Sequence, residues 1–346
     1  MRLHTLLLLA TTLVSVPATV VAAPFTALHV FGDSLSDNGN ASILVGGLLP
    51  AAPYMPGRAS NGPVAAEYLA AALGLPLTPA LAPGGGTNYA VIGAATGPVA
   101  LPTPADPDNL ADNLAETYGT TLPASTGLLN GQVPAFLTIA PSLPSSAITD
   151  ALFFVWGGAN DLGITFDRGP EADPNVPIVA AARIGAVLDL LYGAGARHFL
   201  VPNLPDLGLT PDGEGNPLAT IATQAFNQAL DAQLASRRAL WSDAQVFSFD
   251  TFALVNHAIA DPALYGFSDV SQPCYVGPPL GAGVPTSVCM DDDAYLFWDG
   301  THPTTRAHAR LGQAFAETVR GEAVPEPVTL LLTAMGVATV MRRRRR

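Results

Sequence analysis

Short apolar segments alternate with longer segments of helical periodicity along most of the chain. The short segments are almost continuously hydrophobic, as in strands that are covered on both faces of a sheet. The predicted strands are residues 27–31, 89–92, 152–156, 198–201 and 246–249, and the predicted helices are residues 64–73, 178–192, 220–240 and 304–320. Strands that alternate with helices predict an α/β protein, with a parallel sheet in a three-layer α/β/α sandwich. A single domain over residues 23–322 is the simplest organisation.

Apolar segments of another kind lie near both ends of the sequence. Arg2 precedes an apolar run that closes with small residues at Ala22, a pattern typical of a secretory signal peptide over residues 1–22. A permanent membrane anchor is the alternative, although the run is shorter than the roughly 20 residues of a spanning helix. At the other end, residues 323–346 contain Val-Pro-Glu-Pro, a short apolar stretch and five arginines.

The C-terminal segment resembles the PEP-CTERM sorting signal of Gram-negative bacteria. The resemblance implies transient anchoring in the inner membrane, cleavage by an exosortase, and release to the cell surface or the extracellular matrix. The arginine block would remain on the cytoplasmic side of the membrane. A plain tail anchor is the alternative, and both interpretations place the body of the protein outside the cytoplasm.

The net charge of the chain bears on its possible partners. The formal net charge is −13, and a body this acidic would repel phosphate backbones, which argues against nucleic acid as a partner.

Cys274 and Cys289 flank a stretch rich in Gly and Pro. A disulfide that closes this loop would stabilise the fold by about 3 kcal/mol, and export favours it over two free thiols. Two cysteines are too few for a zinc site built on thiolates.

Ser34 directly follows the first predicted strand, in the sequence Gly-Asp-Ser-Leu-Ser. Ligands of open parallel sheets bind beyond the carboxyl ends of the strands, so this serine is expected at the ligand crevice. A glycine before it permits the sharp turn that would expose the hydroxyl. Taken alone, such a segment is more often an ordinary turn.

Asp299 and His302 lie three residues apart, just before the last predicted helix. A serine hydroxyl is a weak nucleophile until a base removes its proton, and the pKa of histidine suits that role. A carboxylate three residues earlier can reach the other ring nitrogen and fix its tautomer. The same residue types also form ordinary helix starts.

Two further segments offer donors for the negative oxygen that forms when a serine attacks an ester. Asn160 follows the third predicted strand and can donate from its side-chain amide, whereas Gly93 follows the second and can donate from its backbone N–H. The backbone N–H of Ser34 is a third donor. Loss of one such donor typically lowers the rate by about 10²–10³. Taken singly, each segment is more typical of a glycine turn at a strand end.

In this order, the four segments resemble the four motif blocks of the GDSL esterases and lipases, also called SGNH hydrolases. The family's Ser, Gly, Asn and His match Ser34, Gly93, Asn160 and His302, and its catalytic acid matches Asp299. The resemblance extends from about residue 25 to residue 320 and implies a flavodoxin-like fold with a five-stranded parallel sheet. The residue before Gly93 departs from the pattern, because many relatives have a second glycine there.

These observations predict an exported serine esterase or lipase that hydrolyses carboxylic esters through an acyl-enzyme, with no metal or organic cofactor. Removal of O-acetyl groups from extracellular polysaccharide is an alternative for the same site, and the sorting tail favours a matrix sugar. A non-catalytic surface or matrix-binding protein is the alternative of another class. The presence of every expected site residue argues against it.

Overall fold

The computed structural model describes residues 25–97, 126–166 and 173–321. The predicted signal peptide and sorting tail lie outside these ranges. Parallel strands form the central sheet, in the order β1 (Leu28–Gly32), β2 (Leu152–Trp156), β3 (His198–Pro202) and β4 (Gln245–Phe249). The predicted α/β class with a parallel sheet is therefore confirmed.

The predicted five-stranded sheet is wrong in one respect, because residues 89–92 form no continuous ladder. This segment runs beside β1, where Tyr89 N–H donates to the Val30 carbonyl at 2.8 Å and Val30 forms one parallel bridge with Asn88. The next ladder donor would be Gly32 N–H, but it donates to Gln132 Oε1 at 2.9 Å instead. The main sheet of the described chain therefore has four strands, with an extended segment along the β1 edge.

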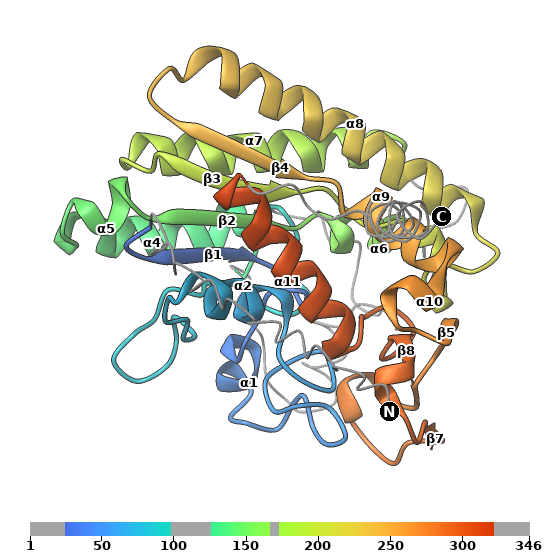
Figure 1. Cartoon of the computed structure of the whole chain (residues 1–346). Coiled ribbons are helices and arrows are strands. Elements are labelled where there is room, and N and C mark those ends of the chain that lie inside the picture. Colours follow the sequence, from blue (N-terminus) through green and yellow to red (C-terminus); the bar gives the residue numbers. More distant parts are fainter. Residues whose placement is uncertain (1–24, 98–125, 167–172, 322–346) are drawn as a thin grey trace, which may run out of the picture.

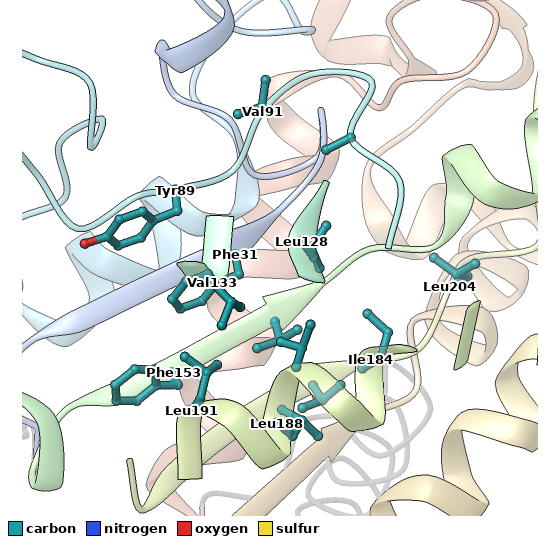
Figure 2. Close-up of a cluster of buried hydrophobic side chains, with 14 of the residues drawn as sticks. Phe31, Tyr89, Val91, Leu128, Val133, Phe153, Ile184, Leu188, Leu191 and Leu204 are labelled. Atoms are coloured by element: carbon teal, nitrogen blue, oxygen red, sulfur yellow. The ribbon is translucent and has the colours of Figure 1, made fainter. Parts of the chain in front are cut away.

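Helices cover both faces of the sheet (Figure 1). On one face lie α7 (Val176–Gly193) and α8 (Pro217–Leu240), and on the other α2 (Ala65–Leu73) and α11 (Thr305–Arg320). Strand side chains alternate between the two layers: Phe31 and Phe153 pack toward α7, whereas Val30 and Phe154 pack toward α2 and α11. Figure 2 shows the cluster on the α7 face.

The remaining helices are α1 (Asn40–Leu44), α4 (Val133–Ile139), α5 (Ser146–Thr149), α6 (Ala159–Phe166), α9 (Thr251–Ala260) and α10 (Pro262–Tyr265). A π-helix, η1 (Leu128–Gln132), leads into α4. Short 3-10 helices are η2 (Ala140–Ser142), η4 (Leu207–Leu209), η5 (Pro211–Gly213), η6 (Pro279–Gly281) and η7 (Asp292–Ala294). Two small sheets pair β5 (Asp269–Pro273) with β8 (Tyr295–Phe297), and β6 (Tyr275–Val276) with β7 (Ser287–Val288).

Cys274 and Cys289 form a disulfide, with their Cα atoms 4.8 Å apart, and it closes the loop that contains β6 and β7. Elsewhere, α7 is the one helix within the described ranges that is long and apolar enough to cross a membrane. Ile184, Leu188 and Leu191 of α7 are buried in the cluster against the sheet. We therefore interpret α7 as a core helix of the sandwich.

Candidate active site

Ser34, Asp299 and His302 meet beyond the carboxyl end of β1, although Ser34 and His302 are 268 residues apart in the chain. Ser34 Oγ lies 2.9 Å from His302 Nε2. His302 Nδ1 lies 2.8 and 3.0 Å from the two carboxylate oxygens of Asp299. An ionised Asp299 places the ring proton on Nδ1, which leaves Nε2 to accept from the serine hydroxyl.

The turn that carries Ser34 packs closely against β2. A Cβ added to Gly32 would lie 2.3 Å from the carbonyl oxygen of Trp156, so only glycine fits there. After it, the Asp33 carboxylate accepts from Leu35 N–H at 3.1 Å, and the Asp33 carbonyl accepts from Ser36 N–H at 3.0 Å. Burial raises the pKa of Asp33 to about 7.

Asp37 ties the Ser34 turn to the Gly93 segment. Its buried carboxylate accepts N–H groups from three residues at the start of α1 and, at 2.9 Å, from Ile92. Burial raises the pKa of Asp37 to about 6, although these hydrogen bonds oppose the increase. Because Ile92 precedes Gly93, one side chain fixes the relative position of the serine and a candidate oxyanion donor.

The turn from Asp299 to His302 is held by its own backbone and by two loops. Asp299 Oδ1 accepts the N–H groups of Thr301 and His302 at 2.9 and 2.6 Å. Tyr54 donates its hydroxyl to Asp299 Oδ2 at 2.8 Å. Asp212 accepts the Thr301 hydroxyl at 2.9 Å, and its own N–H donates to the Gly300 carbonyl at 2.8 Å.

Sequence reasoning missed both Tyr54 and Asp212. Tyr54 lies in an irregular loop and Asp212 in the 3-10 helix η5, and no motif or spacing connects either residue with the turn that it contacts. Burial, together with the charge and hydrogen bond of Asp299, raises the pKa of Tyr54, so the phenol keeps its proton and acts as a donor.

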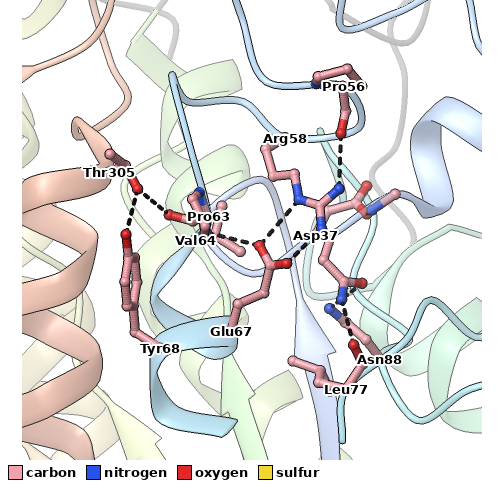
Figure 3. A network of polar contacts seen from close by, with 12 residues as sticks. Asp37, Pro56, Arg58, Pro63, Val64, Glu67, Tyr68, Leu77, Asn88 and Thr305 are labelled. Atoms are coloured by element: carbon pink, nitrogen blue, oxygen red, sulfur yellow. Dashed lines mark hydrogen bonds and ion pairs between the residues drawn. The ribbon is translucent and has the colours of Figure 1, made fainter. Parts of the chain in front are cut away.

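A network of polar contacts also fixes the helix that follows His302 (Figure 3). Arg58 pairs with Glu67 of α2 through bonds of 3.1 and 2.5 Å. The next residue of α2, Tyr68, has its hydroxyl 2.8 Å from Thr305 Oγ1 at the start of α11. The end of α11 nearest the site is thereby attached to α2.

Opposing effects set the charge of the Asp299–His302 pair. Burial favours the neutral acid, but the His302 charge and the hydrogen bonds to the carboxylate outweigh it and lower the pKa of Asp299. Burial also favours neutral His302, but Asp299, Asp33 and Asp212 together raise the pKa of the imidazole. Asp299 is therefore ionised near neutral pH, and the imidazole is basic enough to take a proton from a serine.

The structure brings the candidate oxyanion residues to the same place. Gly93 and Asn160 line a cavity together with Ser34, Asp299 and His302, and the volume of this cavity is about 1080 Å³. Gly93 adopts a φ of 78°, which favours glycine. Asn160 donates from its amide nitrogen to the carbonyl of Ala94, the residue after Gly93, at 2.9 Å. An amide carries two such N–H groups.

The cavity contains candidates for each component of acyl transfer: a serine beside a histidine, a carboxylate that contacts the histidine, and nearby N–H groups. In the part of the chain that the structure describes, no group of three or more His, Cys, Asp or Glu side chains is placed to hold a metal ion. These features define a serine-hydrolase type of site on an α/β/α scaffold.

Comparison with known families identifies the family. A family model described as GDSL-like Lipase/Acylhydrolase matches residues 28–315, which is most of the chain. The protein therefore belongs to the GDSL lipase/acylhydrolase family, and residues 28–315 form an ester-hydrolysing domain of that family.

Several curated proteins are similar over most of this chain. The anther-specific proline-rich protein APG of Arabidopsis thaliana is 28% identical over 83% of this chain and 60% of its own length. An uncharacterised Pseudomonas putida protein is 29% identical over 82% of this chain, which spans only 46% of that protein. Acetylajmalan esterase 2 of Rauvolfia serpentina is 27% identical over 85% of this chain and 90% of its own length.

Among solved structures, two esterases align with most of this chain at low identity. A putative arylesterase from Agrobacterium tumefaciens has a TM-score of 0.43 and 15% identity, over 86% of this chain and 99% of that one. The acetylxylan esterase Axe2 from Geobacillus stearothermophilus has a TM-score of 0.43 and 12% identity, over 87% and 96% of the two chains.

Proposed function

We propose that the protein is an exported serine esterase or lipase that uses Ser34, His302 and Asp299 to hydrolyse carboxylic esters. The observation that carries this proposal is the chain of short hydrogen bonds on the cavity wall. It runs from Ser34 Oγ to His302 Nε2 at 2.9 Å, and from His302 Nδ1 to Asp299 at 2.8 Å.

The reaction proceeds in two acyl-transfer steps. His302 Nε2 takes the hydroxyl proton as Ser34 Oγ attacks the ester carbonyl, and the backbone N–H groups of Ser34 and Gly93 and the Asn160 amide stabilise the oxyanion. The intermediate collapses, the ester C–O bond breaks, and protonated His302 gives its proton to the leaving alkoxide. Water then attacks the acyl-enzyme by the reverse path, which releases the acid and restores Ser34.

A pair of serine variants tests this mechanism. Ser34→Ala should lower the hydrolysis of p-nitrophenyl acetate by at least about 10⁴-fold and abolish labelling by a fluorophosphonate probe. Ser36→Ala is the matched control: Ser36 is fully buried two residues away, and its Oγ has no hydrogen-bond partner among the described residues. Full activity of Ser34→Ala, or equal losses in both variants, would remove Ser34 from the mechanism.

An acetyl ester is a second candidate substrate. It is supported by the relative named acetylajmalan esterase, which is 27% identical over 85% of this chain. We propose acetylated extracellular polysaccharide as the source of that ester. Acetate release from an acetylated polysaccharide, compared with the hydrolysis of p-nitrophenyl esters by the same preparation, distinguishes this substrate from a lipid.

Export and sorting complete the proposal. Residues 1–22 would direct export, and residues 323–346 would anchor the protein briefly in the inner membrane until an exosortase cleaves it. The pairing of Cys274 with Cys289 is consistent with an oxidising compartment. In a Gram-negative host that carries an exosortase, the full chain should reach the cell surface or medium with a shortened C-terminus. Accumulation of the uncleaved chain in the cytoplasm would refute this part.

A further inference from the structure

The cavity that holds Ser34 and His302 continues into a third hydrophobic cluster, apart from the two that pack against the central sheet. Each member of this cluster is less than 8% exposed, and each also lines the cavity. We call this part of the cavity the apolar limb; its lining includes Ala258, Tyr265, Phe267, Leu296, Phe297 and Ala307.

Helical spacing shows how the walls of the apolar limb are built. On α9, Thr251, Leu254, Val255 and Ala258 line the cavity, and these positions follow the three- and four-residue steps of one helix face. The start of α11 contributes Ala307, Arg310 and Leu311 to the same lining, and Arg310 is the charged member of this set. Figure 1 shows α9, α10, β5 and β8 gathered on the same side as this end of α11.

Other residues of the cavity lining have a different chemical character. They include the polar residues Asp206, Thr210, Asp212 and Asn216, from the η4–η5 loop and the residue before α8. The whole cavity, at about 1080 Å³, lies at the upper limit of the roughly 300–1,000 Å³ of most small-molecule sites. An acetyl group next to Ser34 would fill only a small part of this volume.

We propose that the apolar limb binds an unbranched alkyl chain of the ester substrate. The proposal rests on the proposed function, because it takes Ser34 as the nucleophile beside which the chain enters. Apolar walls that face a cavity gain from contact with an apolar chain that leaves water. The alkyl chain can belong either to the acid or to the alcohol part of the ester. The two arms of the experiment distinguish these two cases.

The first measurement is a pair of chain-length profiles on the full protein. One arm uses p-nitrophenyl esters from acetate to dodecanoate, and the other uses acetates of alcohols from ethanol to dodecanol, all below their aggregation limits. We expect kcat/KM to rise by about fourfold per methylene in one arm until the limb is filled. The arm that responds identifies which part of the ester carries the alkyl chain. No dependence on length in either arm would overturn the proposal.

The second measurement compares two alanines of α9. Ala258 is 4% exposed and lines the limb, whereas Ala260 is exposed and lies outside the cavity lining. Ala258→Phe should lower the ratio of long-chain to acetate kcat/KM by about tenfold or more. Ala260→Phe should leave this ratio unchanged.

Two checks keep the result interpretable. Labelling of Ser34 by a fluorophosphonate probe reports whether each variant is folded, and Leu254→Phe, on the same helix face, replaces Ala258→Phe where the latter does not fold. An unchanged long-chain to acetate ratio in a folded, blocked variant would overturn the proposal. If the proposed function itself is wrong, the result is distinguishable, because the wild-type protein would then neither hydrolyse acetate esters nor be labelled at Ser34 by the fluorophosphonate probe.

Discussion

His308 should make the fold sensitive to acid. The side chain is fully buried where α11 meets α2, and its Nδ1 accepts the backbone N–H of Ala65 at 3.2 Å. Burial, with a smaller contribution from the charge of His302, lowers the pKa of His308 from its ordinary 6.5 to about 3. The folded protein therefore keeps this ring neutral at pH values where the unfolded chain protonates it.

The sign and size of the effect follow from proton linkage. Between about pH 6.5 and pH 3 the unfolded state binds one more proton at His308 than the folded state, so the stabilisation present above pH 6.5 is lost as the pH falls. The loss is about 1.4 kcal/mol per pH unit, or about 2 kcal/mol between pH 6.5 and pH 5. Asp33 and Asp37 act in the opposite direction, because their pKa values are raised to about 7 and about 6 in the folded state.

Comparing the wild-type protein with a His308 variant separates the contribution of His308 to the pH dependence of stability from that of the carboxylates. His308→Asn retains a side-chain acceptor near the Ala65 N–H but cannot be protonated. Free energies of unfolding from urea titrations at pH 7.5 and pH 5 should show a pH-dependent loss about 2 kcal/mol larger in the wild-type protein than in the variant. His257→Asn, on the exposed side of α9, is the control and should behave like the wild-type protein. Equal pH dependence in His308→Asn and the wild-type protein would refute the reasoning.

Three further predictions concern the site and its scaffold. Tyr54→Phe removes the hydroxyl that donates to Asp299 at 2.8 Å, so it should lower the free energy of unfolding by about 1.5–3 kcal/mol and reduce kcat more than it changes KM. Steady-state kinetics and urea unfolding measure these effects, and a change in KM alone would contradict them. Because Asp299 helps to raise the pKa of His302, kcat/KM should increase with pH through an apparent pKa above 6.5. In Asp299→Asn the rate should fall by about 10⁴-fold and this pKa should decrease, as a pH–rate profile would reveal. Gly32→Ala should destabilise the fold by at least about 1–3 kcal/mol, because the added methyl would lie 2.3 Å from a backbone oxygen of β2. Gly193→Ala is its control in thermal unfolding, since nothing lies within 4 Å of that added methyl.

Much of the fold was predictable because local signals agree with the tertiary structure. The continuous apolar runs became β1 to β4, and the motif residues around Ser34 and His302 lie within hydrogen-bond distance. The failure at residues 89–92 has a long-range cause, because Gln132, 100 residues from Gly32, takes the N–H that would have extended the ladder. A contact of that kind leaves no trace in the periodicity of either segment.

The parts of the site that the sequence did not predict come from an irregular loop and from a short 3-10 helix. Tyr54 and Asp212 reach the Asp299–His302 turn from segments with no periodic pattern, so only the folded chain reveals their roles. The apolar limb, too, could not be predicted from the sequence. Its walls combine a face of α9 with residues of β8 and α11, and each of these elements alone resembles an ordinary core element.

The single carboxylate of Asp37 has a consequence for how the enzyme meets its substrate. Because that one group accepts N–H groups both from the start of α1 and from Ile92, it joins the segment after Ser34 to the segment before Gly93 in the absence of an ester. Donors that are already oriented need no reorganisation when charge develops on the substrate. The free energy of substrate binding can then be directed to selecting the substrate instead of assembling the site.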